Sequence, residues 1–131
     1  MIAFGGSATS AASVTIVTPA SGTQILVDTP FDSNGAYNAG GFTFNYVYLQ
    51  VYDVDLITVI VAVNADIPSS GQWTNPTDPL TGLSLLKSPS RVSVGLGATK
   101  DFKMKASLYV SGSGLVANAT QNLKVNYPAG P

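Results

Sequence analysis

The 131-residue sequence contains no cysteine, no histidine and no glutamate. Without cysteine, the chain has no disulfide framework, no thiolate metal site and no cysteine nucleophile. Without histidine, it lacks the commonest general base and the commonest metal ligand of proteins. A serine–histidine–aspartate triad is therefore excluded, and no G-x-S-x-G motif presents a nucleophilic serine. We predict a protein that is not an enzyme and that uses no metal or cofactor.

Charge is scarce as well: only 10% of the residues are charged, against roughly 25% in an average soluble domain. Residues 1–86 hold six of the seven aspartates and no lysine or arginine, whereas residues 87–131 hold all six basic residues and one aspartate. We favour neutralisation between neighbouring strands; in the alternative, the two halves face different ways and copies attract head to tail. The basic half is weak evidence for nucleic acid, and we expect no nucleic-acid partner.

Long apolar runs are also missing. The longest, residues 56–63, is far shorter than the roughly 20 residues of a membrane-spanning helix, so no membrane span is expected. The opening MIAFGGSATSAASV has no basic region followed by an apolar one, and we expect no signal peptide there. Residues 1–12 are small and predict a flexible arm, residues 13–127 a single domain, and residues 128–131 a tail.

The residues that are abundant favour strands and turns: valine, threonine, serine, glycine, asparagine and tyrosine. We predict an all-β fold without substantial helix, an antiparallel β-sandwich of about eight strands, either immunoglobulin-like or a jelly roll. Residues 30–41 and 65–79 are expected to be loops. The expected strands are 13–18, 23–28, 41–52, 56–64 (a central strand), 80–86, 90–95, 101–110 and 120–127.

The segment RVSVGLGATKDFKMKASLYVSG, in the last third of the chain, resembles the later strands of immunoglobulin-like modules. In those modules a glycine-containing turn precedes a strand of alternating polar and apolar residues. The Cys…Trp…Cys pattern of true immunoglobulin domains is missing here. The resemblance implies a sandwich fold and no particular activity.

The strand expected at residues 41–52 has two apolar faces. Val47, Leu49 and Val51 share one side, because strand side chains alternate, and an aromatic row occupies the other side. If the valine face is the core, the aromatic row is an exposed platform for protein contact or for stacking on sugar rings. If the aromatic face is the core, another element covers the valines. The row comprises Phe42, Phe44, Tyr46, Tyr48 and Tyr52.

Asp53 and Asp55 follow this strand directly. In an unbroken strand they would fall within an apolar stripe, and burial of unpaired charge is costly. We therefore predict a chain reversal there, with both aspartates in a structural turn. A calcium site with further aspartates is the second interpretation and a catalytic carboxylate pair the third.

Alternation also predicts the core and the contact residues. The predicted core consists of Val59, Val61, Phe102, Met104, Leu108, Leu123 and Val125. The strand at residues 13–18, next to the arm, is expected to pair with a neighbouring copy. The candidate interface consists of Phe44, Tyr46, Tyr48, Tyr52, Trp73, Val14 and Ile16.

These features lead to two functional hypotheses. The first is a non-enzymatic structural protein that contacts other copies of itself or other structural proteins: a virion component (capsid, cement, spike or tail subunit) or a filament subunit, located in a virion or an extracellular assembly. It rests on the low charge, the predicted sandwich, the arm and the aromatic row. The second is a carbohydrate-binding module in which Trp73, placed in the loop at residues 65–79, and the tyrosines stack on a glycan.

Overall fold

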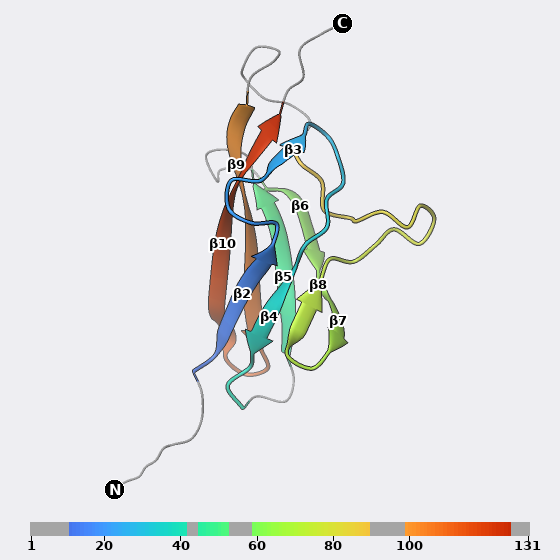
Figure 1. Cartoon of the computed structure of the whole chain (residues 1–131). Helices are drawn as coiled ribbons and strands as arrows, with labels where there is room; N and C mark the ends of the chain where they lie inside the picture. Colours follow the sequence, from blue (N-terminus) through green and yellow to red (C-terminus); the bar gives the residue numbers. More distant parts are fainter. Residues whose placement is uncertain (1–10, 42–44, 53–58, 90–98, 127–131) are drawn as a thin grey trace, which may run out of the picture.

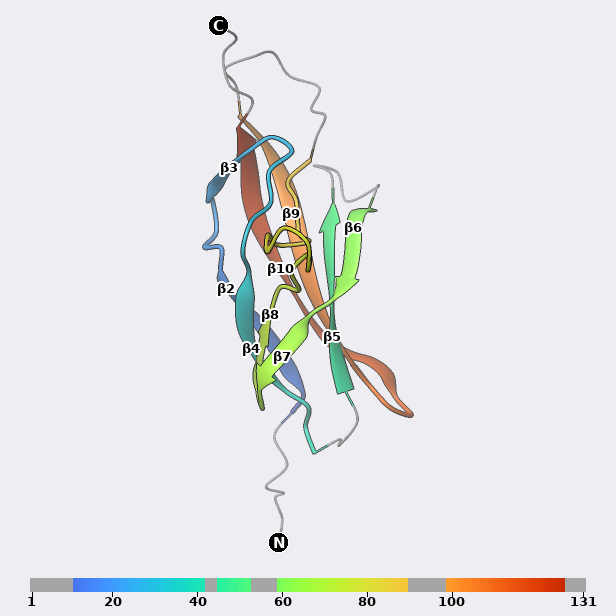
Figure 2. The same ribbon diagram turned by 90° about the vertical axis from the view of Figure 1, so that its right-hand side faces the viewer.

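The computed structural model describes residues 11–41, 45–52, 59–89 and 99–126. The fold is all-β, and the described residues form no helix. The strands lie in two layers, which Figure 2 shows edge-on. Their bounds are β2 Ser13–Thr18, β3 Gln24–Leu26, β4 Asn34–Asn38, β5 Asn45–Tyr52, β6 Val59–Asn64, β7 Asp66–Ser69, β8 Gln72–Thr74, β9 Thr99–Val110 and β10 Gly114–Asn126.

One sheet has five strands in the order β3-β10-β9-β5-β6, and the other has four in the order β2-β4-β8-β7 (Figure 1). Every pair of neighbouring strands is antiparallel except β3 and β10, which run parallel. The expectation of about eight antiparallel strands is therefore only partly met. The all-β, two-sheet character agrees with the prediction, whereas the described part alone has nine strands and one parallel pair.

The core lies between the sheets and follows the predicted alternation in the long strands. Every second residue of β9 from Phe102 to Val110 is buried, as are Leu123 and Val125 of β10. The valine face of β5 is completely buried, which decides between its two apolar faces. Val14 of β2 and Trp73 of β8 complete the core from the four-stranded sheet.

The prediction for β6 is wrong in part. It was expected to be a central strand with Val59 and Val61 in the core, but β6 is the outer strand of its sheet. Val59 is 41% exposed and Val61 is only partly buried. An edge strand has a neighbouring strand on one side only. The side chains at its end are therefore less buried than those of a central strand. β5 and β6 run antiparallel with Tyr52 opposite Val59, so the chain does reverse between them, as predicted.

Two expected loops contain strands instead. Asn34 and Gly35 fall in the loop expected at residues 30–41, yet both belong to β4. Gly35 is needed there because a methyl group on residue 35 would overlap the Thr15 carbonyl oxygen and would come within 2.7 Å of Trp73 Nε1. A glycine within a strand can mark such a close approach instead of a turn. Likewise the expected loop at residues 65–79 contains the β7–β8 hairpin.

Two further expectations differ or lie outside the described residues. Residues 80–86 were expected to form a strand, but residues 80–85 belong to a projecting hairpin with one isolated bridge, between Thr77 and Ser84, and Leu86 is buried at its base. The strand expected at residues 90–95 lies outside the described residues.

Candidate contact surfaces

The outer face of the five-stranded sheet carries the tyrosines of β5. Because Val47, Leu49 and Val51 point into the core, Tyr46, Tyr48 and Tyr52 point away from it. Tyr46 is 43% exposed, and the other two are partly exposed. Within the described residues, no element packs over this face of the sheet (Figure 2). These three residues of the aromatic row are thus on the surface. Phe44 lies outside the described residues.

A fourth tyrosine joins them from β9. Tyr109 lies opposite Tyr46 in the β5–β9 ladder, and their rings stack with centroids 5.1 Å apart and planes 8° from parallel. Tyr48 meets Tyr109 edge to face at 6.4 Å. The three rings and Asn64 of β6 line an open hollow of about 270 Å³. We call Tyr46, Tyr48, Tyr109 and Asn64 the tyrosine hollow.

Tyr109 was not among the predicted contact residues, although it alternates with the buried Leu108 and Val110 and so lies on the outer side of β9. The missing information was the pairing of β9 with β5, which sets Tyr109 beside Tyr46. The only sequence signal for this contact was that β5 and β9 each carry tyrosine on the face opposite to their apolar residues. Their register, however, depends on residues far apart in the chain.

Polar and basic residues continue the same face along β9. Lys105 lies opposite Gln50, and Lys103 lies opposite Tyr52. Both lysines are partly exposed. The face therefore combines tyrosine rings with long polar and positively charged side chains, a composition that suits protein contact because tyrosine offers rigid apolar area together with a hydroxyl.

Three members of the predicted interface lie elsewhere. Trp73 is 1% exposed, and its Nε1 donates a hydrogen bond to the Thr15 carbonyl oxygen at 3.0 Å. Val14 is 6% exposed and Ile16 is partly buried, both packed in the core of their own chain. The strand at residues 13–18 is β2, paired with β4 of the same sheet. The side chains of Val14, Ile16 and Trp73 therefore pack within their own chain, unlike the exposed contact residues that were predicted, whereas β2 is an edge strand and its pairing with a neighbouring copy stays a prediction.

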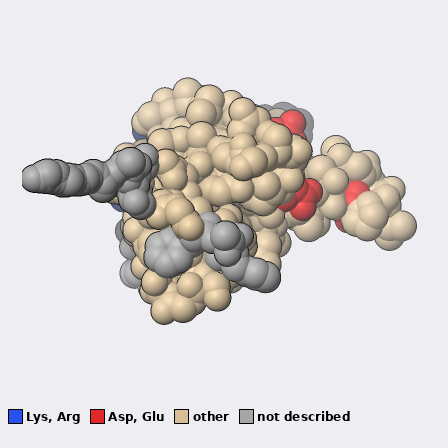
Figure 3. All heavy atoms as spheres, turned by 90° about the horizontal axis from the view of Figure 1, so that it is seen from below, with Lys and Arg blue, Asp and Glu red and all other residues tan. Residues whose placement is uncertain are grey.

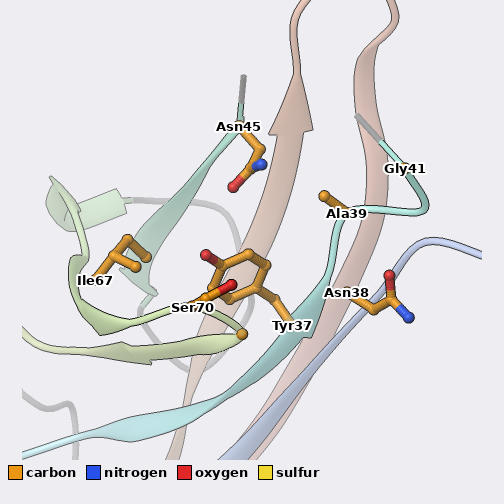
Figure 4. Close-up of a pocket in the computed structure, with 8 residues that line it drawn as sticks. Tyr37, Asn38, Ala39, Gly41, Asn45, Ile67 and Ser70 are labelled. Atoms are coloured by element: carbon orange, nitrogen blue, oxygen red, sulfur yellow. The ribbon is translucent and has the colours of Figure 1, made fainter. Parts of the chain in front are cut away.

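A second hollow lies at the end of the sandwich nearer the N-terminus and is predominantly polar. Figure 4 shows it between β4, β5, β7 and the β7–β8 turn. Its polar side chains are hydroxyls and amides, from Tyr37, Asn38, Asn45 and Ser70. These groups can donate and accept hydrogen bonds, and none of them is a carboxylate or an amine. The hollow therefore offers a polar docking surface and no acid–base pair.

Two ion pairs lie on the surface of the described residues. Lys87 Nζ lies 2.8 Å from Asp28 and Lys124 Nζ lies 2.7 Å from Asp101, and all four side chains are substantially exposed. The Lys124 ammonium holds the pKa of Asp101 below the ordinary value, through its hydrogen bond first and its charge second. The Asp28–Lys87 pair joins the acidic and basic halves of the sequence, as local neutralisation predicts. Among the described residues, no three carboxylates gather as a metal site would require.

Asp53 and Asp55 lie outside the described residues, so the turn, calcium and catalytic interpretations stay as the sequence left them. No helix in the described ranges is long and apolar enough to cross a membrane.

No protein-family model, curated protein or solved structure matches this chain.

Proposed function

We propose that this chain is a non-enzymatic structural protein that self-associates through the outer face of its five-stranded sheet, as a component of a virion or a filament. The observation that carries the proposal is the tyrosine hollow. Three tyrosines from two strands pack together on a sheet face that no described element covers. Exposed aromatic clusters of this kind are typical of protein interfaces.

The ring pairing and the burial of Trp73 together favour protein contact over the carbohydrate alternative. A sugar stacks on the open face of an aromatic ring, but Tyr46 and Tyr109 already use one face of each ring on one another. Trp73, the other residue of the glycan hypothesis, is in the core. The second ring faces, the ring edges and the hydroxyls remain for a partner, and together they suit the mixed apolar and hydrogen-bonded contacts of a protein surface.

We also propose an immunoglobulin-like arrangement of the sheets. With the strands lettered A, A′, B, C, C′, D, E, F and G in chain order, the sheets read A-B-E-D and A′-G-F-C-C′. This order contains the ABED and CFG sheets of immunoglobulin constant domains, with one further strand at each edge of the second sheet. Interstrand NMR contacts that pair the strands in another order would contradict it.

Sedimentation velocity over a wide concentration range tests the function. The wild-type chain is expected to exceed the 13.5 kDa monomer mass, and the double variant Tyr46→Ser/Tyr109→Ser is expected to sediment as a monomer. Val17→Ser is the matched control, because Val17 is an exposed apolar residue of the other sheet. The buried Trp73 reports by fluorescence that each variant is folded.

Two results would overturn the proposal. One is a wild-type chain that stays monomeric throughout. The other is a double variant that associates as well as the wild type. A monomer that binds polysaccharide and loses this binding in the double variant would establish the carbohydrate-binding alternative instead.

A further inference from the structure

A hairpin of residues 76–85 projects from the side of the sandwich (Figure 1). Its tip is the most exposed apolar site that the structure describes: Leu80 is 93% exposed, and Leu83 and Leu85 are exposed as well. We call this segment the leucine hairpin. A leucine surrounded by water at the tip of a loop has no role in the stability of its own fold, which raises the question of what covers it.

The leucine hairpin has a defined conformation. The Asp78 amide donates to the Leu83 carbonyl at 2.8 Å, and the Leu85 amide donates to the Pro76 carbonyl at 3.0 Å. At the tip, the Leu80 amide donates to the Asp78 carboxylate at 2.8 Å. The Asp78 carboxylate thus fixes the backbone that carries Leu80. The side chains of Asp78 and Leu80 therefore lie together at the tip.

Both legs of the hairpin are attached to the body of the domain. On one leg, Asn75 and Ser33 exchange two hydrogen bonds of 2.8 Å each. On the other, the Phe31 amide donates to the Leu86 carbonyl at 3.0 Å, and the Leu86 side chain is completely buried. The leucine hairpin is therefore a rigid projection, and its docking requires little loss of conformational entropy.

The hairpin cannot cover the tyrosine hollow of its own chain. It extends sideways, away from both sheets, whereas the hollow lies on the outer face of the five-stranded sheet (Figures 1 and 2). A hairpin that reaches such a face must therefore belong to another copy. The hollow, of about 270 Å³, offers aromatic walls to an apolar side chain.

The charges of the two surfaces are complementary. Residues 59–86 contain Asp66 and Asp78 and no basic residue, and Figure 3 shows acidic side chains on the side from which the hairpin projects. On the other surface, Lys105 lies two outward positions from Tyr109 along β9, about 13 Å at the rise of a β-strand. Lys87, two residues beyond Leu85, is paired with Asp28, and residues 76–85 contain no basic residue, which disfavours binding to a membrane surface because such surfaces are commonly anionic.

We propose that the leucine hairpin of one copy docks on the tyrosine hollow of the next, with Leu80 against the tyrosines and Asp78 facing Lys105. This inference rests on the proposed function and names the partner of that surface. The contact is heterologous: each copy offers a hairpin to one neighbour and a hollow to another. Such contacts repeat into rings or open filaments instead of closing as a two-fold dimer.

Mixing two variants tests this arrangement by sedimentation velocity. Leu80→Ser keeps the hollow, Tyr46→Ser/Tyr109→Ser keeps the hairpin, and each alone is expected to be monomeric. Their mixture is expected to form one-to-one dimers and nothing larger, since only one productive contact remains. Leu26→Ser, at an exposed leucine of β3, is the control and is expected to associate like the wild type.

A charge exchange tests the orientation. Asp78→Lys and Lys105→Asp are each expected to weaken association about tenfold, as unfavourable pairs in an interface do. The double variant is expected to bind more tightly than either single variant but less tightly than the wild type, because Asp78→Lys also removes the carboxylate that holds the Leu80 amide. If the double variant is no tighter than the singles, the proposed alignment of Asp78 with Lys105 is wrong.

Other outcomes separate the two proposals. If Leu80→Ser still associates while the tyrosine variant does not, the hairpin inference fails and the proposed function stands. If the wild-type chain does not associate at all, both fail. Flotation of the wild-type chain, but not of Leu80→Ser, with neutral phosphatidylcholine vesicles would assign the hairpin to a lipid surface and overturn the inference.

Discussion

The Trp73 indole lies across Gly35 so closely that residue 35 has no room for a side chain. A methyl group there would meet the Thr15 carbonyl oxygen and, at 2.7 Å, Trp73 Nε1. The same indole nitrogen donates to that carbonyl, so β2, β4 and β8 meet at one point of the core. The packing of the four-stranded sheet depends on this contact.

Gly35→Ala is therefore expected to destabilise the fold by about 3 kcal/mol or more, because the indole and the β2 backbone must both move. Chemical denaturation followed by Trp73 fluorescence measures the change. Gly112→Ala is the control: it has open space around it and a positive φ, and its expected cost is only about 1 kcal/mol. Equal costs for the two variants would contradict the proposed role of the indole contact.

The position of β2 predicts that two of its valines respond differently to replacement by aspartate. Val14→Asp places a carboxylate in the core and is expected to prevent folding or to cost several kcal/mol. Val17→Asp, at a side chain that is 62% exposed, is expected to change the free energy of unfolding by no more than about 0.5 kcal/mol. Thermal melts of both variants measure the difference. A tolerated Val14→Asp would mean that β2 does not belong to its own chain's sandwich.

The core of β9 is tested by Phe102→Ala. Phe102 is fully buried and meets Phe31 edge to face, with ring centroids 6.1 Å apart. Its truncation is expected to cost about 3–5 kcal/mol in urea unfolding. Val59→Ala, at the exposed end of β6, is expected to cost less than about 1 kcal/mol. A cheap Phe102→Ala would show that the two faces of β9 are assigned the wrong way round.

The ion pair of Asp101 and Lys124 predicts how the pKa of Asp101 changes when the lysine is removed. Lys124→Gln removes the hydrogen bond and the charge that lower the pKa of Asp101, so this pKa is expected to rise toward its ordinary value. Because the folded pKa lies below the unfolded one, the pair stabilises the fold above the unfolded pKa and loses this effect as the pH falls through the folded one. Carboxyl NMR titration measures the shift, and an unchanged pKa in the variant would refute the assignment to Lys124.

Asp53 and Asp55 remain predicted to be structural turn residues. Replacement of both by asparagine is expected to change stability by about 1 kcal/mol or less, as exposed turn substitutions do. Melting curves with calcium and with a chelator are expected to coincide for the wild type. A calcium-dependent melting temperature that the double variant loses would favour the calcium interpretation.

The sequence by itself determined the features that depend on local periodicity and composition. Alternation in β9 identified Phe102, Met104 and Leu108 as core residues, because the pleat of a strand fixes which side chains share a face. The scarcity of good helix formers predicted the all-β fold. The absence of histidine and cysteine excluded the chemistries that need them.

The tertiary structure decided everything that depends on which strands become neighbours. The period of β5 defines two apolar faces, but only the opposing sheet selects Val47 and its companions as the core. Gly35 was placed in a loop because the two groups that require glycine there come from other strands: the Thr15 carbonyl from β2 and the Trp73 indole from β8, almost 40 residues further along the chain. Tyr46 and Tyr109 are separated by more than 60 residues, and only the β5–β9 register brings their rings together. The local sequence pattern determines on which face of a strand a side chain lies. The residues that this side chain contacts are determined by strand pairing and burial across the whole chain.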